Sequence, residues 1–203
     1  SRALEAALYT LRNAGKRIRP NLVFKTAALF DVYDENVERI ACAVELIHNY
    51  SLIHDDLPCM DDDDMRRGKP SCHVAFDEAT ALLAGDALIN LAFGVVCSEE
   101  SAGMIGAENA VRASRTLSEY VGVDGMIGGQ VVDLISEGKQ IDLDTVMYIH
   151  KLKTCALIQA AVSMGCIAAG KDDKTIKKAA EYGYNLGLAF QIVDDILDVE
   201  GDE

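Results

Sequence analysis

The chain has 203 residues, of which 33 are Asp or Glu and 19 are Lys or Arg, so its net charge is −14. This length is enough for one domain with its own hydrophobic core. The acidic balance argues against nucleic acid or an anionic membrane as the main partner, because both would be repelled. An anionic substrate would therefore have to be held by local cations and bound metal ions.

Six cysteines are spread along the chain, and none forms a Cys-x-x-Cys pair. We expect most of them to be small buried hydrophobes in a reducing cytosol, and no secretory signal is visible. The sequence therefore predicts a cytoplasmic protein without disulfides. These cysteines are Cys42, Cys59, Cys72, Cys97, Cys155 and Cys166.

Apolar residues recur at helical spacing through nearly the whole chain, and only three prolines interrupt them. The first clear amphipathic run begins at Val37 and continues to Ser51, and Pro58 should end or kink that helix. Residues 143–170 predict one long helix, or a helix broken around Lys153 and Thr154. Residues 136–139 predict a loop, and residues 175–199 predict a last helix.

Residues 79–97 are apolar on almost every side and nearly long enough to span a bilayer. Asp86 in the middle of this stretch would cost about 2.5–3.5 kcal/mol in a membrane. We therefore predict a buried helix in the middle of the domain and no stable membrane insertion. Asp86 would face a polar cavity or be hydrogen-bonded in the core. The fold class predicted is all-α, a single-domain helical bundle around a central cavity.

Two aspartate clusters follow apolar segments. Carboxylates this close together repel one another by about 4 kcal/mol per pair at 4 Å and an effective dielectric of about 20. Mg²⁺ offsets this repulsion, since it takes carboxylate oxygens and keeps water or substrate phosphates as its other ligands. Two clusters facing each other would hold a metal-bound diphosphate. The clusters are Asp55, Asp56 and Asp61, and Asp194, Asp195 and Asp198.

Each cluster also has another interpretation. The second cluster alone could be a solvated acidic helix face. The first cluster could be a calcium-binding loop, but it is not an EF-hand, because the positions that need Gly and Glu hold Arg66 and Cys72.

Basic residues lie close to the acids in the sequence. Lys16 and Arg19 are three residues apart, which would place them on one helical face, and Arg66 and Arg67 follow the first acidic run. Arginine binds phosphate oxygens bidentately, whereas lysine supplies a point charge. Any one of these pairs could also be an exposed charged face.

The order of these motifs resembles the trans-type isoprenyl diphosphate synthases, the polyprenyl synthetase family, over nearly the whole chain. The four-residue gap between Asp56 and Asp61, with Pro58 inside it, is most similar to bacterial farnesyl and plant geranylgeranyl diphosphate synthases. The motifs are Gly15-Lys16-x-x-Arg19-Pro20, Ser51-Leu52-Ile53-His54-Asp55-Asp56-x4-Asp61, Arg66-Arg67-Gly68, Gly128-Gly129-Gln130-x2-Asp133, Lys153-Thr154 and Phe190-Gln191-x2-Asp194-Asp195-x2-Asp198.

The resemblance implies a reaction and its metal. Isopentenyl diphosphate would be joined head to tail to an allylic diphosphate, dimethylallyl or geranyl, with about three Mg²⁺ ions and with Mn²⁺ as a possible substitute. Asp55, Asp61 and Asp194 would bind the metals, and Asp56, Asp195 and Asp198 would help or lie behind them.

The resemblance also assigns the substrate contacts. The allylic diphosphate would contact Arg66, Lys153 and Gln191, and the carbocation would face Thr154 and Gln191. Isopentenyl diphosphate would be held by Lys16, Arg19, His48 and Arg67. A core histidine is the alternative for His48. The residues given catalytic roles are Asp55, Asp61, Asp194, Lys153, Thr154 and Gln191.

Tyr50 and Ser51 lie five and four residues before Asp55, so a growing hydrocarbon tail that follows this helix would meet the ring of Tyr50. An aromatic ring at this position of the family suggests that elongation stops at the C15 farnesyl product. An ordinary core tyrosine is the alternative. We expect His73 and His150 to be structural or to lie on the surface.

Four activities remain open from sequence. The first is a synthase of farnesyl, geranylgeranyl or geranyl diphosphate, and the second is a terpene cyclase or head-to-head condensing enzyme. The third is a His-Asp phosphohydrolase, suggested by His54-Asp55, and the last is a non-catalytic partner subunit. The resemblance implies a homodimer. It also implies that residues 1–203 are a single synthase domain from which both ends of the family domain are missing.

Overall fold

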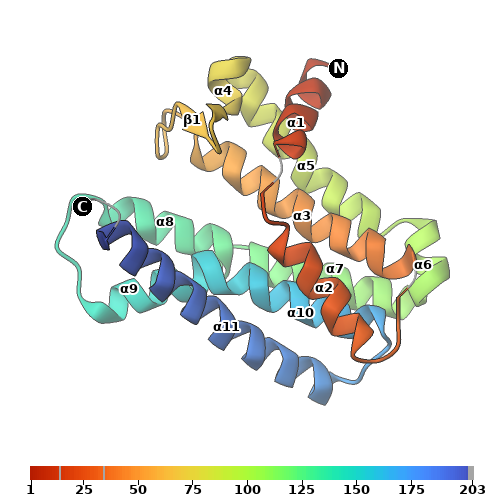
Figure 1. Cartoon of the computed structure of the whole chain (residues 1–203). Helices are drawn as coiled ribbons and strands as arrows, with labels where there is room; N and C mark the ends of the chain where they lie inside the picture. Colours follow the sequence, from red (N-terminus) through yellow and green to blue (C-terminus); the bar gives the residue numbers. More distant parts are fainter. Residues whose placement is uncertain (14, 34, 201–203) are drawn as a thin grey trace.

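The computed structural model describes the backbone of residues 1–13, 15–33 and 35–200, and their side chains except those of residues 36 and 198–200. It is almost entirely helical, so the predicted all-α class is confirmed (Figure 1). The first half contains α1 (Arg2–Arg12), α2 (Ile18–Ala28), α3 (Glu35–Asp55), α4 (Cys72–Ala75), α5 (Glu78–Val96) and α6 (Glu99–Ile105). The second half contains α7 (Ala107–Val121), α8 (Met126–Ser136), α9 (Leu143–Ile149), a π-helix (His150–Cys155), α10 (Ala156–Ala168) and α11 (Asp173–Glu200).

Helix α10 is the central helix of the bundle. It packs against α11, α2, α7 and α3, and nearly all of its residues are buried (Figure 1). A helix that is apolar all round is the expected occupant of such a position. Helix α3 packs in turn against α5 and α2, and these helices form the body that carries the site.

Two helical stretches are long and apolar enough to cross a membrane by length and composition alone, Glu78–Val96 and Leu143–Ala168. In the second, 72% of the apolar window is buried inside the bundle, as expected for a core helix. The first is buried over only 33% of its window.

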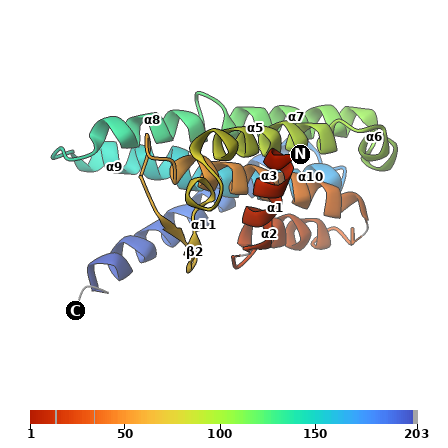
Figure 2. The same ribbon diagram turned by 90° about the horizontal axis from the view of Figure 1, so that it is seen from above.

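The prediction that residues 79–97 form a fully buried helix is therefore wrong. The inner face of α5, with Ala84 and Leu88, packs on the bundle, whereas Leu82, Leu83 and Leu91 are 44–56% exposed. The helix lies at the edge of the bundle, with α3 and α1 against its inner face (Figure 2).

Two local expectations also need correction. Lys16 and Arg19 do not share a helical face, because α2 begins only at Ile18 and Arg17 before it is left-handed, with φ of 52°. A short antiparallel hairpin, β1 (Met65–Arg66) and β2 (Lys69–Pro70), interrupts the helices. Its turn residues Arg67 and Gly68 both have positive φ, as this tight hairpin turn requires.

The cysteines are only partly as expected. Among the described residues all six are free thiols, and Cys72, Cys155 and Cys166 are buried. The other three, Cys42, Cys59 and Cys97, are exposed, because they lie on outward positions of their helices and turns.

Helix α8 approaches the π-helix closely at Gly129. A β-carbon at this position would lie 2.6 Å from the backbone nitrogen of Lys153 and 2.7 Å from the Cβ of Leu152. We expect Gly129→Ala to lower the free energy of unfolding by about 1–3 kcal/mol, because a rigid backbone has to move. Gly94→Ala on α5 is the matched control, since nothing lies within 4 Å of its added methyl. Urea denaturation measures both, and equal stability of the two variants would contradict the expectation.

Candidate active site

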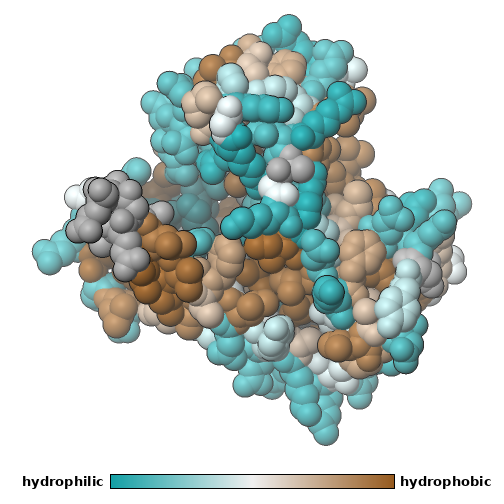
Figure 3. All heavy atoms as spheres, in the orientation of Figure 1, coloured by the Kyte–Doolittle hydropathy of each residue, from teal (hydrophilic) through white to brown (hydrophobic). Residues whose placement is uncertain are grey.

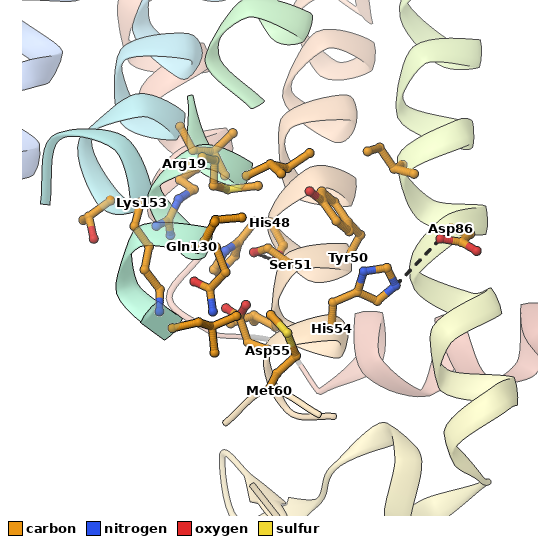
Figure 4. A pocket seen from close by; sticks show the side chains of 18 residues that line it. Arg19, His48, Tyr50, Ser51, His54, Asp55, Met60, Asp86, Gln130 and Lys153 are labelled. Atoms are coloured by element: carbon orange, nitrogen blue, oxygen red, sulfur yellow. Dashed lines mark hydrogen bonds and ion pairs between the residues drawn. The ribbon is translucent and has the colours of Figure 1, made fainter. Parts of the chain in front are cut away.

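A cavity of about 560 Å³ opens between α3, α5, α8 and the π-helix (Figure 4). Arg19, Asp55 and Lys153 bring charge to one part of its lining, and His54 and Asp86 are polar groups on the side of α5 (Figure 4). The apolar wall consists of Leu52, Met60, Ile89, Met126, Ile127, Val131, Leu134 and Leu157. The predicted central cavity is thus present, and one end of it can take charge while the rest can take hydrocarbon.

The first aspartate cluster is shaped by the end of α3. The helix stops at Asp55, and the chain then turns back so that the backbone N–H of Asp61 donates to the carbonyl of Asp55 at 2.9 Å. Pro58 inside this turn cannot continue the helix, as the sequence predicts. The turn therefore brings Asp61 back beside Asp55.

Burial raises the pKa of Asp55 to about 6; Lys153 lowers it in part, and Asp61 raises it further. The oxygens of Asp55 and Asp61 are hard donors of the kind that Mg²⁺ takes. A divalent cation between them would offset both the burial and the mutual repulsion, so this pair fits the metal that the family resemblance implies.

Asp56 has a different partner. Its side chain is 3% exposed, and its Oδ1 accepts from Nε of Arg66 at 2.9 Å and from Nη2 of the same guanidinium. Nη2 of Arg66 also donates to Asp63 at 3.2 Å. The structure therefore brings two predicted site residues together as an ion pair, and Asp56 fixes Arg66 beside the cavity.

Lys153 and Thr154 owe their placement to the π-helix. A π-turn inserts a residue into the helical repeat and redirects the side chains that it carries. Nζ of Lys153 donates to Asp133 Oδ2 of α8 at 2.6 Å, and both Lys153 and Thr154 line the cavity. Asp133 has no role predicted from the sequence, because nothing in the spacing shows that it meets a lysine 20 residues later.

The second cluster is connected to the cavity through Thr154. Its Oγ1 donates to Gln191 Oε1 at 2.7 Å, and Nε2 of Gln191 donates to Asp195 at 2.8 Å. His150 Nε2 lies 3.3 Å from the other oxygen of Asp195, a contact that residue spacing does not reveal. Asp194 is half-buried on the same helix, and the side chain of Asp198 lies outside the described residues.

The C-terminal ends of α3 and α11 lie at the same side of the molecule in both views (Figures 1 and 2). Two consecutive residues connect the clusters: the charge of Lys153 lowers the pKa of Asp55, and Thr154 donates a hydrogen bond to Gln191. Within the described part of the chain, no three carboxylate, histidine or cysteine side chains already form a metal site. A metal site shared by the two clusters therefore stays a prediction.

A cationic group lies beside the polar part of the cavity. Nη2 of Arg67 lies 3.5 Å from Nε2 of His48, and its Nη1 donates to the carbonyl of Asn13 at 2.9 Å. Burial, followed by the charges of Arg19 and Arg67, lowers the pKa of His48 to about 2, so this imidazole is neutral. Arg19 and His48 line the cavity, whereas Lys16 is exposed and does not.

Two buried nitrogens near this group have no hydrogen-bond partner among the described residues, Nε of Arg19 and Nε2 of Gln130. Gln130 also lines the cavity, although its place in a motif predicts no role for it. Buried donors without partners are rare in folded proteins, so a bound ligand, ion or water is the expected partner of these two nitrogens.

Tyr50 is 6% exposed and lines the cavity on the side of α5. Its ring packs edge-on against His54 with 5.4 Å between centroids, and His54 faces Asp86 at 3.9 Å (Figure 4). Ser51 donates to the carbonyl of His48 at 2.9 Å. The ring of Tyr50 thus stands beside the apolar wall, as its predicted chain-length role requires.

The comparisons with known proteins agree in one family. The family model described as polyprenyl synthetase matches residues 1–203. The chain is 48% identical over 200 residues to the farnesyl diphosphate synthase of Escherichia coli (strain K12), covering 98% of this chain and 67% of that protein. It is 44% identical to the heterodimeric geranylgeranyl pyrophosphate synthase large subunit 1 of Arabidopsis thaliana, covering 96% of this chain and 53% of that protein.

Two solved structures share the fold. One is an apo FPP/GFPP synthase from Zymomonas mobilis, with a TM-score of 0.92 and 43% identity, covering 98% of this chain and 71% of that one. Another is a geranyltransferase from Helicobacter pylori complexed with magnesium and isoprenyl diphosphate, with a TM-score of 0.86 and 37% identity, covering 96% of this chain and 65% of that one. The motifs, the helical cavity and these matches agree, and the chain belongs to the polyprenyl synthetase family.

Proposed function

We propose that the protein is a Mg²⁺-dependent prenyltransferase. It joins isopentenyl diphosphate head to tail to dimethylallyl or geranyl diphosphate and ends at farnesyl diphosphate. The observation that carries this proposal is the cavity in which Asp55, Lys153 and Arg19 adjoin a long apolar wall. Such a cavity suits a substrate with a diphosphate at one end and a hydrocarbon at the other.

The allylic diphosphate would lie between the two aspartate clusters, where Lys153 and Arg66 supply positive charge. Magnesium, held by Asp55, Asp61 and Asp194, would stabilise the charge that develops on the leaving diphosphate. Asp195 and Asp198 would support it from α11. The similar Helicobacter pylori geranyltransferase, whose structure is a complex with magnesium and isoprenyl diphosphate, supports this metal. Mn²⁺ takes the same oxygen ligands and could replace it.

The apolar wall would exclude water from the carbocation left when the carbon–oxygen bond breaks. The bonded pair Thr154 and Gln191 would orient oxygen dipoles toward that cation. The isopentenyl double bond would then form the new carbon–carbon bond, and the released diphosphate would take the proton that is lost. No side-chain base is assigned to this step.

Isopentenyl diphosphate would be bound by Arg19, His48 and Arg67, with Lys16 approaching from its exposed position. Nε of Arg19, which has no partner among the described residues, is a donor that this diphosphate would satisfy. Because the two diphosphates then have separate cationic groups, the site favours condensation of two substrates over cyclisation of one.

A neutral His48 can act through hydrogen bonds alone. We expect His48→Gln to keep the Michaelis constant for isopentenyl diphosphate within about threefold, because an amide oxygen can also accept from Arg67. His48→Ala should raise it about tenfold or more, because the guanidinium of Arg67 then loses its contact with the imidazole and is no longer oriented toward the diphosphate. Steady-state kinetics at saturating allylic substrate measures both. Equal losses in the two variants would show that an imidazole itself is needed.

The exposed apolar residues Leu82, Leu83 and Leu91 on α5 would be covered by a second copy of the chain, which gives the homodimer expected from the resemblance. A face of this kind is unusual on a monomer. Residues 1–203 would belong to one synthase domain, and the enzyme would act in the cytoplasm, as expected from its acidic charge and free thiols.

Incubation of the protein with isopentenyl and dimethylallyl diphosphates and Mg²⁺ tests the proposed function. We expect a C15 diphosphate, and none when the metal is chelated. A C20 product would favour geranylgeranyl synthesis, which the 44% identity to the Arabidopsis protein keeps as the second candidate. Cyclic products, phosphate release alone or no reaction would each contradict condensation.

A further inference from the structure

Glu45 on α3 is a buried carboxylate that belongs to none of the motifs. It is 7% exposed, and it lies one helical turn before His48, beneath the cationic group. Buried carboxylates are rare unless they are paired. Its position beside the proposed isopentenyl diphosphate subsite therefore calls for a physical reason.

The partners of Glu45 are well defined. Its Oε1 accepts from Nη1 of Arg17 at 2.5 Å and from Nδ2 of Asn49 at 3.0 Å. Its Oε2 is buried and has no partner among the described residues. Arg17 also donates through Nη2 to the carbonyl of Leu11 at 2.7 Å, so one guanidinium joins the end of α1 to α3.

The connection between α1 and α2 is held to α3 at a second point. Arg67 donates to the carbonyl of Asn13 and contacts His48 on α3. A β-carbon on Gly15 would lie 2.5 Å from Nη2 of Arg67, so the chain passes directly against this guanidinium. The ion pair of Arg17 with Glu45 and the contact of Arg67 with His48 thus fix the same connection from both sides.

The negative charge of Glu45 also stabilises the charged forms of the neighbouring arginines. Burial lowers the pKa of Arg19, the nearby charge of Glu45 opposes that change, and Glu45 opposes the lowering of the pKa of Arg67 in the same way. Like charges this close destabilise the folded state unless an opposite charge lies among them. Glu45 therefore both anchors Arg17 and lets the neighbouring guanidiniums converge.

We propose that Glu45 is a positioning residue of the isopentenyl diphosphate subsite. By holding Arg17, it fixes the connection that carries Lys16 and leads directly into the first turn of α2, where Arg19 lies. This inference rests on the proposed function. It predicts the direction in which the affinity for an anion changes when Glu45 is neutralised. Removing the negative charge alone would strengthen the binding of an anion, whereas losing the ion pair with Arg17 weakens it.

Glu45→Gln tests this directly, since the amide keeps the size and one acceptor but not the charge. In the presence of EDTA, calorimetry with inorganic pyrophosphate should show a dissociation constant raised about tenfold. With Mg²⁺, the Michaelis constant for isopentenyl diphosphate should rise similarly, and that for dimethylallyl diphosphate should stay within about twofold. Glu38→Gln, an exposed position on the same helix, is the matched control and should change neither.

Arg17→Gln gives a second measurement if Glu45→Gln folds poorly. When the two residues act as one unit, the double variant binds pyrophosphate no more weakly than Arg17→Gln alone. The proposal is overturned if Glu45→Gln binds pyrophosphate as tightly as the wild type or more tightly, or if its Michaelis constants rise equally for both substrates. It is also overturned if the losses of affinity in the double variant are additive, or if the wild type does not bind pyrophosphate. A wild type whose pyrophosphate binding is weakened by Glu45→Gln but which elongates nothing would instead refute the proposed function.

Discussion

Replacing Tyr50 by alanine is expected to extend the main product from C15 to C20 and longer chains. The phenol is 6% exposed, lies about one and a half turns before Asp55 on α3, and stands beside the apolar wall of the cavity. Removing the ring opens space on the side of α5, where His54 and Asp86 are the next residues of the lining. In the proposed role the hydrocarbon ends against the ring, so without the ring it would continue past this position. Chromatography and mass spectrometry of the dephosphorylated products measure the chain length.

Tyr50→Phe is the matched control for this experiment. It keeps the ring and loses only the hydroxyl, so its product should remain C15. A product of Tyr50→Ala that is still C15, from a variant that turns over and melts near the wild type, would make Tyr50 an ordinary core residue.

Replacing Asp55 by asparagine is expected to lower kcat by at least about 10³-fold, because the proposed mechanism depends on a metal ion held at Asp55 to stabilise the leaving diphosphate. The side chain is half-buried at the polar end of the cavity, and Asp61 is held beside it by the turn after α3. Asparagine keeps the shape but is a weaker ligand for a hard cation. Initial rates over a titration of Mg²⁺ measure the loss, which excess metal should restore only in part.

Asp62→Asn is the matched control, because it removes the same charge from the same acidic run. Asp62 is exposed and has φ of 53°, a conformation that asparagine tolerates well. We expect its rate to stay within about twofold of the wild type, since exposed surface substitutions have small effects. Similar losses in both variants would mean that the acidic run acts through its total charge and not through a ligand at Asp55.

Features that depend on local sequence were predicted well. The helical class, the end of the helix near Pro58 and the last helix follow from apolar spacing and from the chemistry of proline, and a break around Lys153 and Thr154 is one of the two alternatives for residues 143–170. The cavity lined by Asp55, Lys153 and Thr154 also follows, since the helices carry these motif residues on their inner faces.

Contacts between distant segments could not be predicted. Spacing places Asp56 and Arg66 near each other but does not show that they pair, and it gives no sign that Lys153 meets Asp133. The π-helix, the two-residue strands and the exposed face of α5 depend on neighbours that periodicity does not reveal. The only sequence feature that marks Glu45 is its position as a charged residue within an apolar helix. Asp86 has the same feature but is exposed, so the feature does not identify a buried carboxylate.

Apolar side chains gather over the C-terminal part of α11 on the face shown in Figure 3, next to the second aspartate cluster. Ile192, Val193, Ile196 and Leu197 are 45–57% exposed there. Asp194 on the same segment is half-buried, and Asp195 accepts from Gln191 while its side chain stays 46% exposed.

The central claim is that the two aspartate clusters share metal ions around one diphosphate. The most direct measurement is a crystal structure of the protein with Mn²⁺ and an unreactive thio-analogue of dimethylallyl diphosphate, in which anomalous scattering locates the metal. We predict anomalous peaks between the carboxylates of Asp55 and Asp61 and that of Asp194, each also bound to a diphosphate oxygen. Peaks confined to one cluster, or a diphosphate bound away from both, would contradict the account.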